Sequence, residues 1–147
     1  MIDRSWIGKN TSQLEVDVEK GQLRFFAKVV GESNPIYTDE SAAQAAGYRS
    51  VLAPPTFLFS LNLAQPDPLA KYIEMGIDLA KLLHGDQQFE YFAPICAGDH
   101  IRLESTITDI FEKKGGALEL VVEETSATNQ MGEVVGKSTQ TLVIRHG

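Results

Sequence analysis

The chain has little cysteine, few basic residues and no long apolar run. Its one cysteine, Cys96, excludes an internal disulfide and fits a reducing compartment. With 13 basic and 20 acidic residues the net charge is -7, which disfavours nonspecific nucleic-acid binding because such binding needs a basic face. No apolar run approaches the length of a membrane span, and the first residues, MIDRSWIGKN, lack the apolar core of a signal peptide. We therefore expect a cytoplasmic protein that binds neither nucleic acid nor membranes.

Several catalytic motifs are also missing from the sequence. It has no metal-ligand spacing, no glycine-rich loop for a phosphate and no nucleophile elbow. Cys96 lies in the run FAPICAGD without a histidine-containing nucleophile signature, so we expect an ordinary thiol. We expect a surface or turn role for His84, and no motif surrounds His100 or His146. The sequence thus predicts neither a metal nor a cofactor.

Size and composition are those of one globular domain. The 147 residues suffice for a single hydrophobic core, and contents of 43% hydrophobic and 22% charged residues are ordinary. No internal repeat or low-complexity segment divides the chain. We expect one domain that spans residues 1–147.

The stretch from Phe25 to Phe59 is dense in helix-breaking and helix-capping residues. Asn34-Pro35 ends one helix, because the residue before proline is pushed out of the α region. Asp39 is placed to cap a second helix over residues 41–46, and Gly47 offers a left-handed stop. Such a density of turns between two apolar segments is typical of a binding site.

A third helix is expected to follow this stretch. The run Phe57–Ala64, FLFSLNLA, is apolar almost all round, which suits a buried helix. Its large apolar residues also alternate, as those of a strand would. The preceding Pro-Pro-Thr favours a helix from Pro55 to Ala64, because proline suits the first helical position.

The remaining patterns place helices before a late series of strands, an order that indicates the α+β class. The first half of the chain has an irregular arm over residues 1–13, a strand over 14–18, a helix over 19–30 and a loop with a helical turn over 65–79. The later strands begin at Leu82 and are separated by turns at 98–99, 113–116 and 129–132, with Ile101, Leu103, Ser105 and Ile107 on one face.

Two segments resemble the MaoC-like dehydratases. The run GESNPIYTDESAAQAAGYRSVLAPPTF, residues 31–57, is similar to the N-terminal signature of that family, and HGDQQFEYFAPICAGD, residues 84–99, is similar to its first long strand and turn. The resemblance implies the hot-dog fold, a curved antiparallel sheet wrapped around a central helix. It also implies action on (R)-3-hydroxyacyl thioesters carried by coenzyme A or acyl carrier protein. A sheet with an exposed edge implies a homodimer or heterodimer.

The catalytic positions of that family are altered in this chain. In active members an Asp precedes the Asn of the Asn-Pro turn by two residues and a His follows it by three, where this sequence has Glu32 and Tyr37. A backbone N–H at the start of the central helix steadies the thioester oxygen, but that position is Pro55, which has no N–H. A phenol with a pKa of about 10 is a poor base at neutral pH. Together these changes predict negligible activity of the isolated chain.

Each altered residue also has a purely structural interpretation. Asn34-Pro35 can serve only as a helix-breaking turn, Tyr37 as a packing residue, and Glu32 as a solvated carboxylate at a helix end. The sequence alone leaves these interpretations open beside the functional ones.

The resemblance is to the non-catalytic half of such enzymes, which holds the acyl chain while a partner chain supplies the catalytic Asp and His. The alternative is a stand-alone homodimer that is a weak acyl thioesterase or a binding module for acyl thioesters. We expect the acyl chain between the central helix and residues 65–79, with Tyr37 at the mouth and Leu52 leading into the helix. The remaining candidate substrate-binding residues are Asn34, Val51, Pro55, Thr56, Phe57, Phe59 and Leu61.

Overall fold

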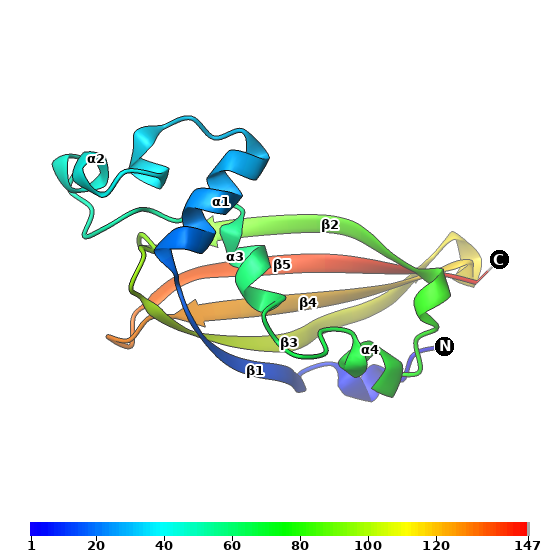
Figure 1. Ribbon diagram of the computed structural model, residues 1–147. Helices are drawn as coiled ribbons and strands as arrows, with labels where there is room; N and C mark the ends of the chain where they lie inside the picture. The colour runs from blue at the N-terminus through cyan, green and yellow to red at the C-terminus, as the bar shows by residue number, and fades with distance from the viewer. Residues whose placement is uncertain (147) are drawn as a thin grey trace.

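The computed structural model describes residues 1–146, which form one five-stranded antiparallel sheet with helices packed against it (Figure 1). The strand order is β1-β3-β4-β5-β2. The strands are β1 (Asn10–Asp17), β2 (Leu82–Tyr91), β3 (His100–Lys113), β4 (Leu118–Thr128) and β5 (Val134–Arg145). The helices are α1 (Lys20–Val30), α2 (Glu40–Ala45), α3 (Phe57–Asn62) and α4 (Ala70–Glu74). Short 3-10 helices cover Arg4–Trp6, Pro35–Tyr37, Leu79–Lys81 and Lys114–Gly116.

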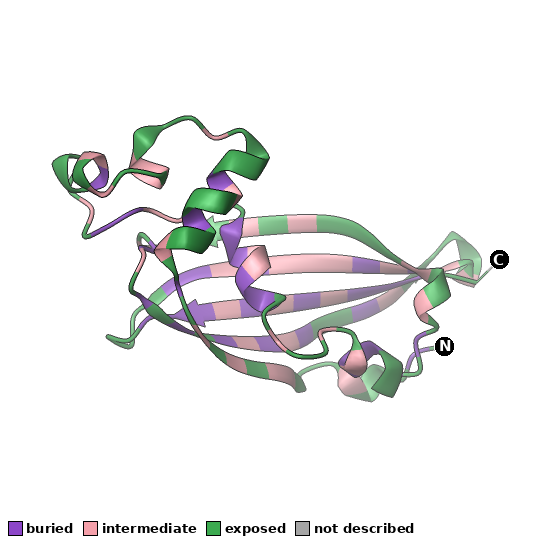
Figure 2. Cartoon of the chain, in the orientation of Figure 1, coloured by how far each residue is buried: buried purple, intermediate pink, exposed green. Residues whose placement is uncertain are grey.

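The sheet curves around α3, which lies across β3, β4 and β5 (Figure 1). Leu58 and Leu61 of α3 are 1% and 2% exposed and pack in one cluster with Leu103 and Val135 of the sheet. Burying each such leucine stabilises the fold by about 1.5–3 kcal/mol. Figure 2 shows the buried residues gathered on α3 and on the strands beneath it. The predicted α+β arrangement of a sheet around a central helix is confirmed.

Alternation on β3 places its apolar residues toward α3. Ile101, Leu103, Ser105 and Ile107 are all buried, as the sequence predicts for one face of this strand. The capping prediction for α2 is also confirmed, because the Oδ1 atom of Asp39 accepts a hydrogen bond from the Ala42 N–H at 2.9 Å. Gly47 has φ 94°, in the left-handed region.

The predicted limits of the central helix are wrong at both ends. Pro55 is exposed and lies in a turn before α3, because the Phe57 N–H bonds back to the Pro54 carbonyl at 2.9 Å. At the other end the N–H groups of Leu63 and Ala64 bond to the carbonyls three residues earlier, whereas an α-helix uses the carbonyl four residues earlier. The α-helix therefore ends before these two residues. Pro55 therefore is not the first helical residue.

Of two segments expected to be mostly irregular, the first is more ordered than predicted and the second contains the expected helical turn. The chain before Leu14 already pairs with β3, since Asn10 and Ser12 stand opposite Thr106 and Ser105. These polar residues join the sheet through their backbone, so they show no apolar alternation. Residues 65–79 contain α4, and three apolar side chains anchor the segment in a second core cluster: Tyr72, Met75 and Ile77.

Within residues 1–146, no helix is both long enough and apolar enough to cross a membrane.

Candidate functional site

The Asn-Pro turn uses its polar side chains to hold its own backbone. The Oδ1 atom of Asn34 accepts a hydrogen bond from the Ile36 N–H at 3.2 Å and so caps the 3-10 helix Pro35–Tyr37. One carboxylate oxygen of Glu32 accepts from the Asn34 N–H at 2.9 Å. Both side chains therefore have a structural role in the turn.

Tyr37 lies in the wall of a hollow of about 330 Å³, the tyrosine pocket. The wall also includes Tyr48, Pro55, Tyr91 and Phe92, and it carries no charged residue. Burial raises the pKa of the Tyr37 phenol, and the charges of Glu32 and Tyr48 raise it further. The phenol is therefore neutral near pH 7, where it can serve as a hydrogen-bond donor but not as a base.

The segment leading into α3 is held between the Asn-Pro turn and the turn after β2. The Leu52 N–H bonds to the Ile36 carbonyl at 3.0 Å, and the Ala53 N–H bonds to the Ile95 carbonyl at 2.8 Å. Leu52 lines the tyrosine pocket. This pairing joins the tyrosine pocket to the start of α3.

Two further hollows lie beside α3 and have Phe59 and His84 in common in their walls; together they are called the α3 groove. The upper part, of about 360 Å³, reaches from Thr56 at the start of α3 to Phe89 of β2. The lower part, of about 330 Å³, is the α3–α4 cavity, between α3, α4 and the sheet. The groove thus occupies the place where the sequence predicts the acyl chain.

The structure separates the predicted substrate-binding residues into three groups. Thr56 and Phe59 line the α3 groove, and Pro55 lines the tyrosine pocket. The remaining four do not line either hollow: Asn34 in the exposed turn, and Val51, Phe57 and Leu61 in the core.

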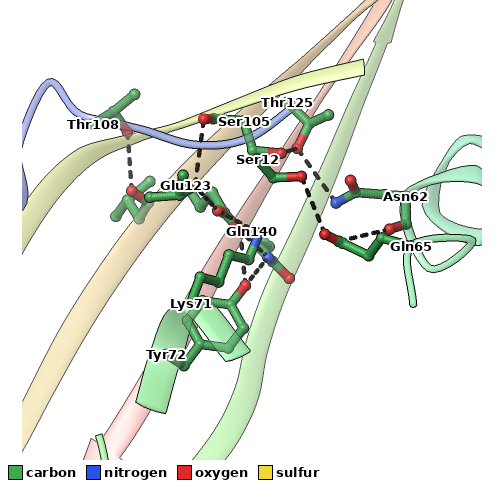
Figure 3. A network of polar contacts seen from close by, with 12 residues as sticks. Ser12, Asn62, Gln65, Lys71, Tyr72, Ser105, Thr108, Glu123, Thr125 and Gln140 are labelled. Carbon is green, nitrogen blue, oxygen red and sulfur yellow. Dashed lines mark hydrogen bonds and ion pairs between the residues drawn. The ribbon is translucent and has the colours of Figure 1, made fainter. Parts of the chain in front are cut away.

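Figure 3 shows a buried polar network in which Lys71, Tyr72 and Gln140, which line the α3–α4 cavity, bond to Glu123, which does not line it. The carboxylate of Glu123 is fully buried and accepts hydrogen bonds from Lys71 Nζ at 2.6 Å, Tyr72 Oη at 2.7 Å and Thr11 Oγ1 at 2.7 Å. Gln140 Nε2 donates to both Glu123 and Tyr72. Every carboxylate oxygen of Glu123 is therefore partnered.

The Lys71 ammonium keeps Glu123 charged. Burial acts to raise the pKa of Glu123, but the charge of Lys71 and the hydrogen bonds outweigh it, so the pKa lies below its ordinary value. Burial and the Glu123 charge raise the pKa of Tyr72 far above its ordinary range. The network is thus an ion pair with a neutral phenol beside it.

Sequence reasoning missed this network. Only Glu123 could have been suspected from the sequence pattern. It alternates with Glu119 and Val121 on one face of β4, and all three residues are buried. A carboxylate that alternates with a buried valine indicates a buried charge and so a partner. Lys71 left no signal, because it lies in the segment that was expected to be mostly loop.

One edge of the sheet is open beside the tyrosine pocket. In the strand order β2 is an edge strand that pairs with β5. Large apolar side chains are exposed on β2, at Leu83 and Tyr91, and directly after it, at Phe92. An unpaired strand edge with apolar side chains can pair with another chain.

Among residues 1–146 no group of three or more His, Cys, Asp or Glu is placed to hold a metal ion.

A family model and a relative of known sequence both match most of the chain. A family model described as "FAS1-like, dehydratase domain region" matches residues 5–138. A UPF0336 protein of Streptomyces avermitilis is 37% identical over 147 residues, which are 98% of this chain and 95% of that protein.

Solved structures show the same fold. A chain of the C-terminally truncated HadBC (3R-hydroxyacyl-ACP dehydratase) complex of Mycobacterium tuberculosis is 28% identical, with a TM-score of 0.76 over 94% of this chain and 96% of that one. A MaoC-like dehydratase is 26% identical, with a TM-score of 0.85, and the match covers 97% of this chain but 43% of that one. The hot-dog fold is thereby confirmed.

Proposed function

Because the chain belongs to the FAS1-like dehydratase-region family, we propose that it is the acyl-holding subunit of an (R)-3-hydroxyacyl-thioester dehydratase. The carrier is coenzyme A or acyl carrier protein, and a partner hot-dog chain supplies the catalytic Asp and His. The observation that carries this proposal is the state of the Asn-Pro turn. Tyr37 is a neutral phenol in an uncharged pocket, and the Glu32 carboxylate bonds to the turn itself.

Dehydration needs a base for the proton at C2, an acid for the leaving hydroxyl and a donor for the thioester oxygen. Pro55 has no N–H to offer as that donor. The loss of one such group commonly costs a hundredfold or more in rate. The chain therefore depends on a partner for turnover.

The α3 groove supports the acyl-holding part of the proposal. Its upper part begins at Thr56, near the family's catalytic positions, and its lower part lies under α4. Phe59, Leu69, Leu79 and Leu142 give it apolar walls, which suit a hydrocarbon chain. The thioester would lie at the Thr56 end and the chain would extend toward α4.

Two observations support a separate partner chain. The open edge of β2 carries exposed apolar side chains, and a second hot-dog chain that pairs there would cover them. The MaoC-like dehydratase that resembles this chain is more than twice as long as the matched segment, and the HadBC structure is a complex of chains. A single domain over residues 1–147 would fill one half of such an assembly.

Hydration of crotonyl-CoA tests the proposal. The purified chain should be inactive alone, and addition of a hot-dog chain with an intact Asp-x-Asn-Pro-x-His turn should give a heterodimer that turns over. Robust turnover by the isolated chain that Tyr37→Phe abolishes would contradict the proposal. A stable homodimer that hydrolyses acyl-CoA would instead support the stand-alone alternative.

A further inference from the structure

The outer face of the sheet carries apolar residues where the open face of an antiparallel sheet is commonly polar. In Figure 1 the helices α1, α3 and α4 lie on the other, inner face, and their buried side chains pack against it. Alternate residues of each strand point to the outer face. Four apolar residues stand there in register on neighbouring strands and form the outer row: Phe111, Leu120, Val143 and Leu83.

Strand register and core contacts together place the outer row on this face. Each member pairs directly with the next across β3, β4, β5 and β2. Phe111 and Val143 are partly exposed, and Leu83 is 49% exposed. Because neighbouring strand residues point to opposite faces, the row points away from the core. The chain neighbour of each member lies in the inner core cluster or packs against it: Ile110, Val121, Leu142 and Leu82.

Charged residues of opposite sign flank the outer row on its two sides. Lys113 of β3 and Arg145 of β5 stand on one side, and Lys113 Nζ lies 5.6 Å from the centre of the Phe111 ring. Asp109 of β3 and Asp86 of β2 stand on the other side. Among residues 1–146 none of these four charged side chains forms an ion pair. The face therefore has an apolar centre, one basic flank and one acidic flank.

We propose that the outer face binds a second copy of this chain, with the two outer rows packed against each other. A half-turn about the line of the row is a two-fold operation that brings each member opposite its own counterpart. The same half-turn exchanges the two flanks. Lys113 of one copy then faces Asp109 of the other, and the reverse pair forms at the symmetric position. The surface is thus complementary to itself in both charge and apolar character.

A second copy suits this face better than a partner of one charge sign does. A uniformly acidic or basic surface would meet like charge on one of the two flanks. Two sheets that pack face to face with nearly aligned strands are a common arrangement. A chain that pairs with the β2 edge adds a strand beside Leu83 but leaves the rest of the outer row open. The interface is therefore additional to the partner chain of the proposed function and does not rest on the acyl-holding role.

The size of the face sets the expected strength of association. Neighbouring strands lie about 4.8 Å apart, and successive outward residues of one strand lie about 6.8 Å apart. The row and its flanks therefore cover a patch of roughly 20 Å by 20 Å, which is less than the ~800 Å² that each partner buries in a standard interface. The association should be weak and should depend on protein concentration.

Sedimentation equilibrium of the purified full chain over a range of concentrations tests the proposal. The average mass should rise with concentration, and Lys113→Glu should weaken this association about tenfold because it places a carboxylate opposite Asp109 at two symmetric positions. Asp109→Lys should have a similar effect. The double variant restores opposite charges and should recover the wild-type association. A dimer formed through the β2 edge should not respond to these reversals, because both residues lie on β3, three strands away.

Val143→Glu and Val134→Glu form a matched pair on β5. Val143→Glu sets two carboxylates face to face at the centre of the interface and should abolish the association. Val134 is 42% exposed and lies outside the outer row, so Val134→Glu should leave the association unchanged. Thermal midpoints show that both variants fold, and the exposed charge reversals test the proposal even if Val143→Glu does not. A wild-type mass that does not change with concentration, an association that survives Val143→Glu, or a double reversal that fails to recover would overturn the proposal.

Discussion

The tyrosine pocket and the α3–α4 cavity differ in whether charged residues line them. Tyr37, which stands where the family resemblance places a catalytic His, lines the tyrosine pocket, and the wall of this pocket consists of phenols, prolines and apolar groups. The wall of the α3–α4 cavity contains neither Tyr37 nor Glu32, but Lys71 lines it and bonds to the charged Glu123. A buried charged pair therefore stands at the α3–α4 cavity, whereas no charged residue lines the tyrosine pocket.

The largest expected effect comes from breaking the buried ion pair. Lys71→Met leaves the Glu123 carboxylate buried without its counter-ion, which commonly costs about 3–5 kcal/mol. We expect a loss of that order in the free energy of unfolding, measured by urea denaturation. Lys20→Met is the control, because the Lys20–Glu40 pair is exposed, at 36% and 41%, and should contribute less than about 1 kcal/mol. Equal losses in the two variants would contradict the distinction.

A pair of identical substitutions compares the two hollows directly. Tyr72→Phe removes a hydroxyl that bonds to Glu123 and Gln140, so we expect a loss of about 1.5–3 kcal/mol in unfolding free energy. Tyr37→Phe removes a hydroxyl for which no hydrogen bond is found among residues 1–146, and it should change stability by less than about 0.5 kcal/mol. Thermal and urea unfolding of both variants measures the difference. A larger effect at Tyr37 would show that its hydroxyl has a partner.

Filling the cavity tests what it holds. Binding of acyl-CoAs should strengthen by about 0.8 kcal/mol for each buried methylene. Leu63 lines the α3–α4 cavity and is 50% exposed, so Leu63→Trp can fill the space without overpacking the core. The variant should bind short acyl-CoAs as the wild type does and lose affinity for long ones. Equal affinity of the two proteins for all chain lengths would place the acyl chain elsewhere.

The sequence predicts the frame of this fold better than the contents of its cavities. Alternation on β3 and the capping residue Asp39 specify local structure through nearest neighbours, and both predictions are confirmed. Leu61 was expected in the groove but lies in the core. In a short helix that is apolar almost all round, the sequence does not mark which side meets the sheet. The contact between Lys71 and Glu123 joins residues 52 positions apart, and only the folded sheet brings them together.

The smallest expected effect concerns pH near neutrality. Tyr37 has a raised pKa and Glu123 a lowered one, so neither changes its charge there. Exposed His100 does, because hydrogen bonds from its ring to Asp17 at 2.7 Å and to Glu15 at 3.5 Å raise its pKa above 6.5. The protonated ring therefore favours the folded chain below pH 6.5, and this contribution is lost as the pH rises through the raised pKa.

Nuclear magnetic resonance titration of the His100 ring measures this pKa. Asp17→Asn should lower it, and added salt should reduce the shift in the wild type because the three side chains are exposed to solvent. Unfolding experiments near neutral pH should show only a weak dependence, and His100→Gln should remove the part that this residue contributes. A strong dependence that persists in His100→Gln would point to a buried group that titrates near neutrality. It would thereby contradict the contrast between a pocket without acid–base chemistry and a cavity with a permanently charged pair.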